Sequence, residues 1–171
     1  ILPGVKIKFY RGHGVIVNGT LLADGTQDKP IIFTSEKDDS VCGSRVNNEP
    51  VCDTNDDATG SAPARGDWQW IGFGSESDPG SSLTNAKLLY GGSDGHNLLA
   101  PIRIHNISPK FENLTIQNSY RNGVQLIGHD WTSQTLDSQT VIYWRYDGHL
   151  NILAANTLTI MPGVMIKSYD G

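Results

Sequence analysis

The stretches ILPGVKIKFYRG (residues 1–12) and IMPGVMIKSYDG (residues 160–171) repeat one phrase, with Pro3 of the first aligned on Pro162 of the second. Both copies contain the Pro-Gly-Val triplet, and five further pairs are identical: Ile1/Ile160, Ile7/Ile166, Lys8/Lys167, Tyr10/Tyr169 and Gly12/Gly171. Self-similarity at a fixed spacing is the signature of a repeat architecture, and this spacing is far longer than one supersecondary repeat. We therefore expect residues 1–171 to form a single module in which 160–171 begin the next copy.

Short segments that alternate apolar and polar residues follow along the whole chain. In VKIKF (5–9) the apolar residues Val5, Ile7 and Phe9 share one parity, which predicts a strand with one buried face. No stretch carries a convincing 3.6-residue apolar stripe, so the sequence predicts an all-β fold. The expected strands are 5–9, 14–19, 30–35, 68–73, 86–92, 101–106, 113–119, 123–128, 140–144, 150–160 and 164–168.

The composition agrees with many short strands, because 19 glycines and 8 prolines interrupt the 171 residues often. A formal net charge of −5, without clustered Lys and Arg, argues against a nucleic-acid partner. No apolar run is long enough to span a bilayer, so we expect no membrane insertion.

Two all-β architectures compete for this pattern. A sandwich would join antiparallel strands by tight turns such as Asn18-Gly19 or Asn122-Gly123. The chain instead repeats a short strand, a polar bend and another strand of the same inward parity, which is typical of a solenoid whose turns stack on one another. Turns of roughly 20 to 25 residues would give about six or seven turns and a rise of about 30 Å.

Several phrases carry a resemblance to a known class: PGVKIKF, VIVNGTLLADGTQDKPIIFTS, GDWQWIGF, LTNAKLLYGG, FENLTIQNSYRNGVQL and ANTLTIMPGV. In this order they resemble the right-handed parallel β-helix modules of large bacterial surface and secreted proteins. The resemblance implies a right-handed parallel β-helix (β-solenoid) located outside the cell or on its surface. It also implies an acidic insertion between the IFTS strand and GDW.

Segment 36–66 interrupts the rhythm with Asp, Asn, Ser, Gly and Pro, and we expect it to be one long acidic loop extruded from the solenoid. Cys42 and Cys52 bracket nine residues of this loop, and a disulfide between them would close it. Such bridges persist outside the reducing cytosol. Free or metal-binding thiols are the alternative, although two cysteines alone lack the ligand count of a structural zinc site.

The same loop contains DTNDDATG, in which Asp53, Asn55 and Asp57 alternate and Gly60 follows. Alternating oxygen side chains before a glycine are typical of calcium loops, since hard cations need six to eight oxygens on a tightly turned backbone. The distal bidentate Glu of an EF-hand is missing. A calcium site is the hypothesis, and a solvated acidic turn is the alternative.

An enzymatic interpretation starts from the polygalacturonases, which combine paired Asp, Gly-His-Gly and Arg-Ile-Lys around the sugar bond. This chain offers Gly12-His13-Gly14, Asp38-Asp39 and Arg103-Ile104-His105, but the acidic pair follows Gly-His-Gly instead of preceding it. Because geometry decides an acid–base assignment before residue type does, we expect no catalytic residues and no enzyme. The tripeptide Arg65-Gly66-Asp67 matches integrin-type motifs and is expected by chance.

Aromatic residues supply the remaining candidates. If Ile71 and Phe73 face the core, Trp70 points outward. With Trp131 and Trp144 it would form a lateral contact surface for sugar rings or a neighbouring subunit, and burial under a loop is the alternative.

These observations favour a structural extracellular protein, a β-solenoid module repeated head to tail in a filament or surface fibre. Its partner would be itself, by covalent tandem copies or by stacked subunits. The alternative is an adhesin or stalk domain that binds polysaccharide, and a polysaccharide-degrading enzyme comes third. Apart from calcium, no cofactor is expected.

Overall fold

The computed structural model describes residues 1–43, 45–46 (backbone only), 49–58, 60–93, 99–145 and 148–168. These residues form β-strands and no helix, which confirms the predicted all-β class. The strands are β1 (Lys6–Phe9), β2 (Val15–Val17), β3 (Leu22–Asp24), β4 (Ile31–Ser35), β5 (Arg45–Val46), β6 (Glu49–Pro50), β7 (Ile71–Phe73), β8 (Ser82–Thr84), β9 (Ala86–Leu89), β10 (Ile102–Ile104), β11 (Lys110–Glu112), β12 (Thr115–Gln117), β13 (Val124–Leu126), β14 (Asp130–Trp131), β15 (Gln134–Leu136), β16 (Ile142–Arg145), β17 (Asn151–Ile152), β18 (Leu158–Ile160) and β19 (Met165–Ser168).

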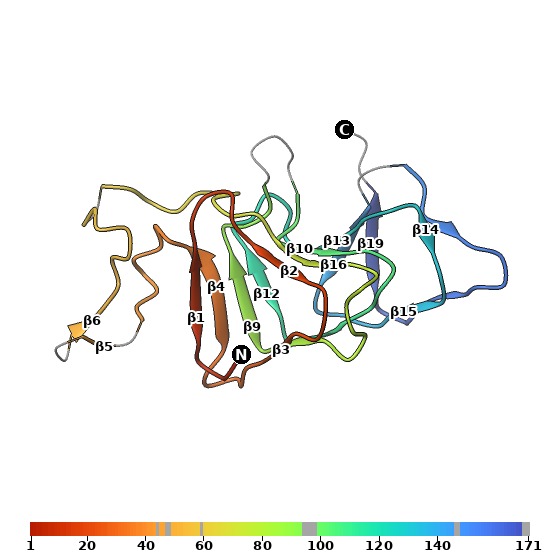
Figure 1. The fold of residues 1–171 in the computed structure, drawn as a ribbon, viewed down its shortest axis with the longest axis horizontal. Helices are drawn as coiled ribbons and strands as arrows, with labels where there is room; N and C mark the ends of the chain where they lie inside the picture. Colours follow the sequence, from red (N-terminus) through yellow and green to blue (C-terminus); the bar gives the residue numbers. More distant parts are fainter. Residues whose placement is uncertain (44, 47–48, 59, 94–98, 146–147, 169–171) are drawn as a thin grey trace.

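The strands pair into separate sheets (Figure 1). A four-stranded sheet has the order β1-β4-β9-β12, a six-stranded sheet the order β19-β16-β13-β10-β7-β2, and a three-stranded sheet the order β11-β8-β3. Two further pairs are β14-β17 and β15-β18. Among the described strands, every pairing is parallel except that of β5 with β6. Parallel pairing argues against the hairpin-linked sandwich, because such a sandwich joins antiparallel strands.

The chain visits the sheets in a constant order. Between β1 and its neighbour β4 come β2 and β3, and between β13 and its neighbour β16 come β14 and β15. The same holds across the acidic loop, where β4 and β7 come between the neighbours β3 and β8 once the β5–β6 hairpin is left aside. When β5 and β6 are left out, two strands always lie along the chain between a strand and its neighbour in the sheet.

The parallel register stacks like residues in columns, and these columns make the core. In the six-stranded sheet Ile71, Ile102 and Val124 lie next to one another, and each is 0% exposed. In the four-stranded sheet Ile7 pairs with Phe33, which in turn pairs with Leu88. Inward residues of neighbouring strands thus bury one another's apolar surface, which is the main favourable term in folding.

The segment 36–66 leaves the sheets as predicted, and Figure 1 shows it extending to one side with the β5–β6 hairpin near its tip. The predicted disulfide between Cys42 and Cys52 is present. Lys8 attaches the loop to the sheets, since its Nζ donates to the Cys52 carbonyl at 2.5 Å. Ser35 and Asp67, which flank the loop, are joined by a hydrogen bond of 2.8 Å from the Ser35 hydroxyl to the Asp67 carboxylate. Polar contacts at its base therefore fix where the loop leaves the sheets.

A search of the described residues for a helix long and apolar enough to cross a bilayer finds none.

Candidate functional site: the end strands and the acidic loop

Exposed large apolar side chains gather at the two ends of the stack of strands. Eleven of the twelve such residues in the described part of the chain lie within 1–22 or 153–166, and only Tyr120 lies elsewhere. The most exposed are Ile16 at 77% and Leu2 at 76%. The two groups are Ile1, Leu2, Val5, Tyr10, Ile16 and Leu22 at one end and Leu153, Ile160, Met161, Met165 and Ile166 at the other. Exposed apolar surface concentrated in this way is typical of an interaction surface.

The same end strands are edges of the sheets. β2 and β19 are the two edges of the six-stranded sheet, β1 is an edge of the four-stranded sheet, and β3 is an edge of the three-stranded sheet. An edge strand presents backbone N–H and C=O groups that can pair with another strand. Both ends therefore combine apolar side chains with backbone groups that can accept a further strand.

The repeated phrase lies on these edges. β1 spans Lys6–Phe9 and β19 spans Met165–Ser168, so the two strands cover the same positions of the phrase that begins near Pro3 and again near Pro162. The two copies occupy different sheets, because β1 pairs with β4 and β19 pairs with β16. One sequence phrase thus forms an edge strand at each end of the molecule.

The three tryptophans predicted for a contact surface have different environments. Trp70 is half-buried, with the Arg103 guanidinium over its ring at 4.3 Å, and Trp144 is half-buried near Arg121 and Lys167 at 5.3 and 5.4 Å. Trp131 is 0% exposed. The prediction of a surface contact is therefore wrong for Trp131, whose apolar ring belongs to the core. Cation–π contacts cover the other two rings, which leaves less aromatic surface for a ligand.

In the acidic loop, the structure brings Asp53 and Asp57 together with Asp39, which the sequence pattern did not include. Each of the three offers a carboxylate oxygen, and these oxygens lie within 4.8 Å of one another. Asn55, which the pattern did include, instead uses its amide nitrogen to donate to Asp57 at 2.8 Å and to Ser61 at 2.9 Å. Asp39 lies in the first half of the loop, and only the folded chain places it beside the second.

Backbone donors hold the turn at Asp53. Its two carboxylate oxygens accept N–H groups from Asp56 and Ala58, both at 2.7 Å, and from Asp57 at 3.3 Å. These bonds, with that from Ala58 the strongest, lower the pKa of Asp53. Nearby, Glu36 is 8% exposed, and burial raises the pKa of its carboxyl. The loop therefore favours a charged Asp53 and disfavours a charged Glu36.

The residues of the enzymatic and integrin-type motifs have local partners. His13 is exposed and its Nδ1 lies 3.1 Å from the Arg11 carbonyl, whereas Asp38 is 2% exposed and accepts the Thr34 hydroxyl at 2.6 Å. Asp67 is 9% exposed and accepts Ser35. A carboxylate committed in this way is unsuited to presenting the tripeptide 65–67 to a receptor.

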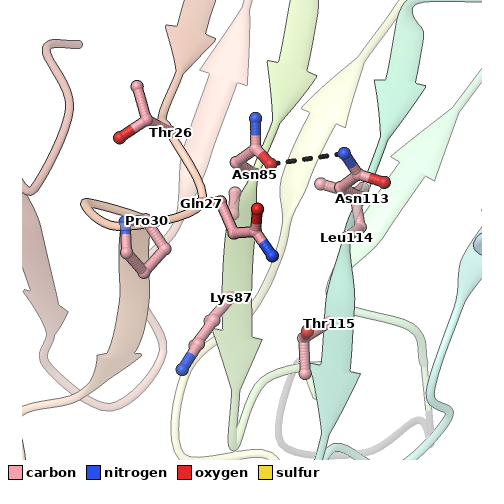
Figure 2. A pocket seen from close by; sticks show the side chains of 9 residues that line it. Thr26, Gln27, Pro30, Asn85, Lys87, Asn113, Leu114 and Thr115 are labelled. Carbon is pink, nitrogen blue, oxygen red and sulfur yellow. Dashed lines mark hydrogen bonds between the residues drawn. The ribbon is translucent and has the colours of Figure 1, made fainter.

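An open groove of about 450 Å³ crosses the four-stranded sheet (Figure 2). Asn85 and Asn113 lie side by side at its upper end, where Asn113 donates to Asn85 at 3.3 Å and Asn85 donates to the Gly25 carbonyl at 3.1 Å. Lys87 and Thr115 line the groove below them. Asn85 and Asn113 have left-handed φ values of 46° and 52°, which asparagine tolerates well. The hydrogen bond between Asn85 and Asn113 links two bends of the chain, and the two side chains form part of the lining of the groove.

Comparison of the chain with protein-family models, curated proteins and solved structures gives no match.

Proposed function

We propose that this chain is a module of an extracellular structural protein, a right-handed parallel β-solenoid that repeats head to tail in a filament or surface fibre. The observation that carries the proposal is the position of β19, a copy of the β1 phrase that lies at an open sheet edge. A strand that already belongs to the next repeat supplies the edge on which that repeat continues.

The strand order defines how successive modules would be related. Without the β5–β6 hairpin, the described chain has seventeen strands from β1 to β19, and three strands make one turn. Sixteen steps therefore correspond to 5⅓ turns per module. At about 4.8 Å per turn the module rises about 26 Å, less than the rise of about 30 Å expected from the sequence. The remaining third of a turn rotates each module by one sheet position relative to the last.

This rotation explains why β1 and β19 belong to different sheets. With β19 in the role of β1 of the next module, the six-stranded sheet of one module continues as the four-stranded sheet of the next. Ile7 pairs with Phe33 within the chain, so Ile166 would pair with Phe33 of the following module. Because Ile166 pairs with Tyr143, Ile7 would in turn lie on Tyr143 of the preceding module. The junction would therefore extend two existing core columns.

The exposed apolar residues support the same arrangement. Ile160, at 49% exposure, and Ile166, at 38%, stack on the buried Leu136 and Tyr143 and would be covered by the next module. A head-to-tail contact of this kind does not close on itself and gives an open filament. The Cys42–Cys52 disulfide supports an extracellular or cell-surface location, because such bonds are rare in the reducing cytosol.

The alternative, an adhesin that holds polysaccharide on exposed aromatic residues, has less support. Of the three tryptophans expected to form its contact surface, Trp131 is buried and Trp70 is covered by Arg103. Retention on immobilised glycans without polymerisation would favour this alternative.

Edge substitutions test the proposal directly. Ile160→Lys and Ile166→Lys each place a charge in a proposed junction, because these residues stack on the buried Leu136 and Tyr143. We expect both to reduce end-to-end association in sedimentation velocity by at least tenfold. Tyr120→Lys is the control, since Tyr120 is an exposed apolar residue away from both ends. Association that is equally sensitive to Tyr120→Lys would contradict end-to-end stacking. If the native repeats are covalent, the same variants should weaken contact between adjacent modules of a tandem chain.

A further inference from the structure

We propose that Asp39, Asp53 and Asp57, with the amide oxygen of Asn55, form a calcium-binding site at the base of the acidic loop. The site is independent of head-to-tail assembly, because it lies in the segment 36–66 outside the parallel sheets. Its role would be to fix the two halves of this loop to each other.

The carboxylate spacing fits a single ion. Calcium binds oxygen at about 2.3 to 2.6 Å, so two ligands on opposite sides of one ion are about 5 Å apart. The oxygens of Asp39, Asp53 and Asp57 lie within 4.8 Å of one another, which places all three within reach of one ion. Without a cation, three carboxylates this close would repel one another.

Buried oxygens without hydrogen-bond donors are the second observation. Asp39 Oδ1, Asn55 Oδ1 and Asp57 Oδ1 are each buried and have no hydrogen-bond partner. The amide nitrogen of Asn55 already donates twice, to Asp57 and Ser61, so its oxygen is the atom left for a ligand. Buried acceptors of this kind are costly unless something positive lies against them.

Glu36 adds a further unpartnered oxygen in the same loop. It is 8% exposed, its Oε2 has no hydrogen-bond partner, and Thr54 of the acidic turn donates to its backbone carbonyl at 2.9 Å. The negative charge of Asp57 is close enough to contribute to the raised pKa of Glu36, after the larger effect of burial. A buried acid thus lies beside the half-buried cluster of acids.

The neighbouring cations of the protein are used elsewhere. Lys37 pairs with Asp67 at 3.5 Å, and Lys8 donates to the Cys52 carbonyl. Within the described residues, no salt bridge neutralises Asp39, Asp53 or Asp57. The local charge therefore favours a divalent ion, and oxygen-only ligands of this number favour calcium with water completing the shell.

The disulfide explains how ligands that are distant in sequence come to lie side by side. Asp39 precedes Cys42, whereas Asp53 and Asp57 follow Cys52. The disulfide brings the two segments together, and the ion would hold them a second time.

Calcium titration of the whole chain, purified in EGTA and desalted, tests the site. Isothermal titration with CaCl₂ up to 5 mM should give one ion per chain, and the melting temperature should rise by several degrees. Asp39→Asn and Asp57→Asn should each weaken binding at least tenfold. Asp56→Asn is the matched control, because Asp56 is exposed, its backbone has φ 59° and asparagine tolerates this conformation; its affinity should stay within twofold.

Three results would contradict the calcium site or its assignment to calcium. The site is refuted if neither heat nor a melting shift appears at 5 mM calcium, or if Asp56→Asn weakens binding as much as Asp57→Asn does. Equal affinity for MgCl₂ would refute the assignment to calcium. Far-UV circular dichroism establishes that each variant is folded, and if Asp39→Asn does not fold, Asp57→Asn against Asp56→Asn decides.

Discussion

Replacement of Trp68 by Ala should destabilise the protein by about 4 kcal/mol. Trp68 is 0% exposed, its ring stacks on Phe9 with centroids 4.6 Å apart, and its Nε1 donates to the Leu89 carbonyl at 2.7 Å. It joins the end of the acidic loop to β1 and to β9. Loss of about 150 Å² of buried apolar surface at about 25 cal/mol per Å² gives about 4 kcal/mol, within the range of about 3 to 5 kcal/mol known for Trp→Ala.

Urea unfolding followed by far-UV circular dichroism measures this effect, since the signal does not depend on the tryptophan removed. With a slope of about 2 kcal/mol per molar urea, the midpoint should fall by about 2 M. Trp68→Phe keeps an aromatic ring against Phe9 and loses the bond to Leu89, and should cost about half as much. Trp144→Phe is the half-exposed control and should shift the midpoint little. A Trp68→Ala midpoint within about 0.5 M of the parent would refute the packing described for this residue.

Two further predictions concern the bends and the core. Asn85→Ala removes the bond to Gly25, the acceptor of Asn113 and a residue suited to φ 46°, and should lower the free energy of unfolding by about 1 to 2 kcal/mol; Asn85→Gly, which tolerates the same φ, should cost less in the same urea assay. Burial raises the pKa of Tyr143 to about 12, so stability should be unaffected below pH 10 and fall by about 1.4 kcal/mol per pH unit between pH 10 and 12. Tyr143→Phe should remove this dependence, and an unchanged slope in that variant would assign it to other groups.

The strands with alternating patterns could be predicted from the sequence. β1, β4, β13 and β19 fall inside the expected segments 5–9, 30–35, 123–128 and 164–168. The strands of the three-stranded sheet were missed, because each has a single inward apolar residue: Ala23, Leu83 or Phe111. Leu83 and Phe111 stand alone between polar neighbours, and Ala23 follows two leucines, so none of the three strands shows an alternation that can be recognised. The expected strand 68–73 would give Trp68 the outward parity of Trp70, but β7 begins only at Ile71 and Trp68 is buried.

The acidic loop shows a similar division. The disulfide and the alternating acids follow from residue types and spacing in the sequence. Asp39 could not be assigned to the site, because a loop closed by Cys42 and Cys52 can bring several earlier residues near Asp53 and Asp57. The sequence also does not show which side-chain oxygens lack a hydrogen-bond donor, because this depends on hydrogen bonds that form only in the folded chain, such as those of Asn55.

The central claim is that modules continue end to end with 5⅓ turns each, and cryo-electron microscopy of a tandem chain tests it most directly. Three copies, joined so that the phrase at Pro162 of one copy serves as the phrase at Pro3 of the next, should form one unbroken rod. We predict an axial repeat of about 26 Å, from about 4.8 Å per turn. We also predict a rotation of one third of a turn between modules, so that the six-stranded sheet continues into the four-stranded sheet of the next copy. Three separate globules, or adjacent modules with no rotation, would contradict the account.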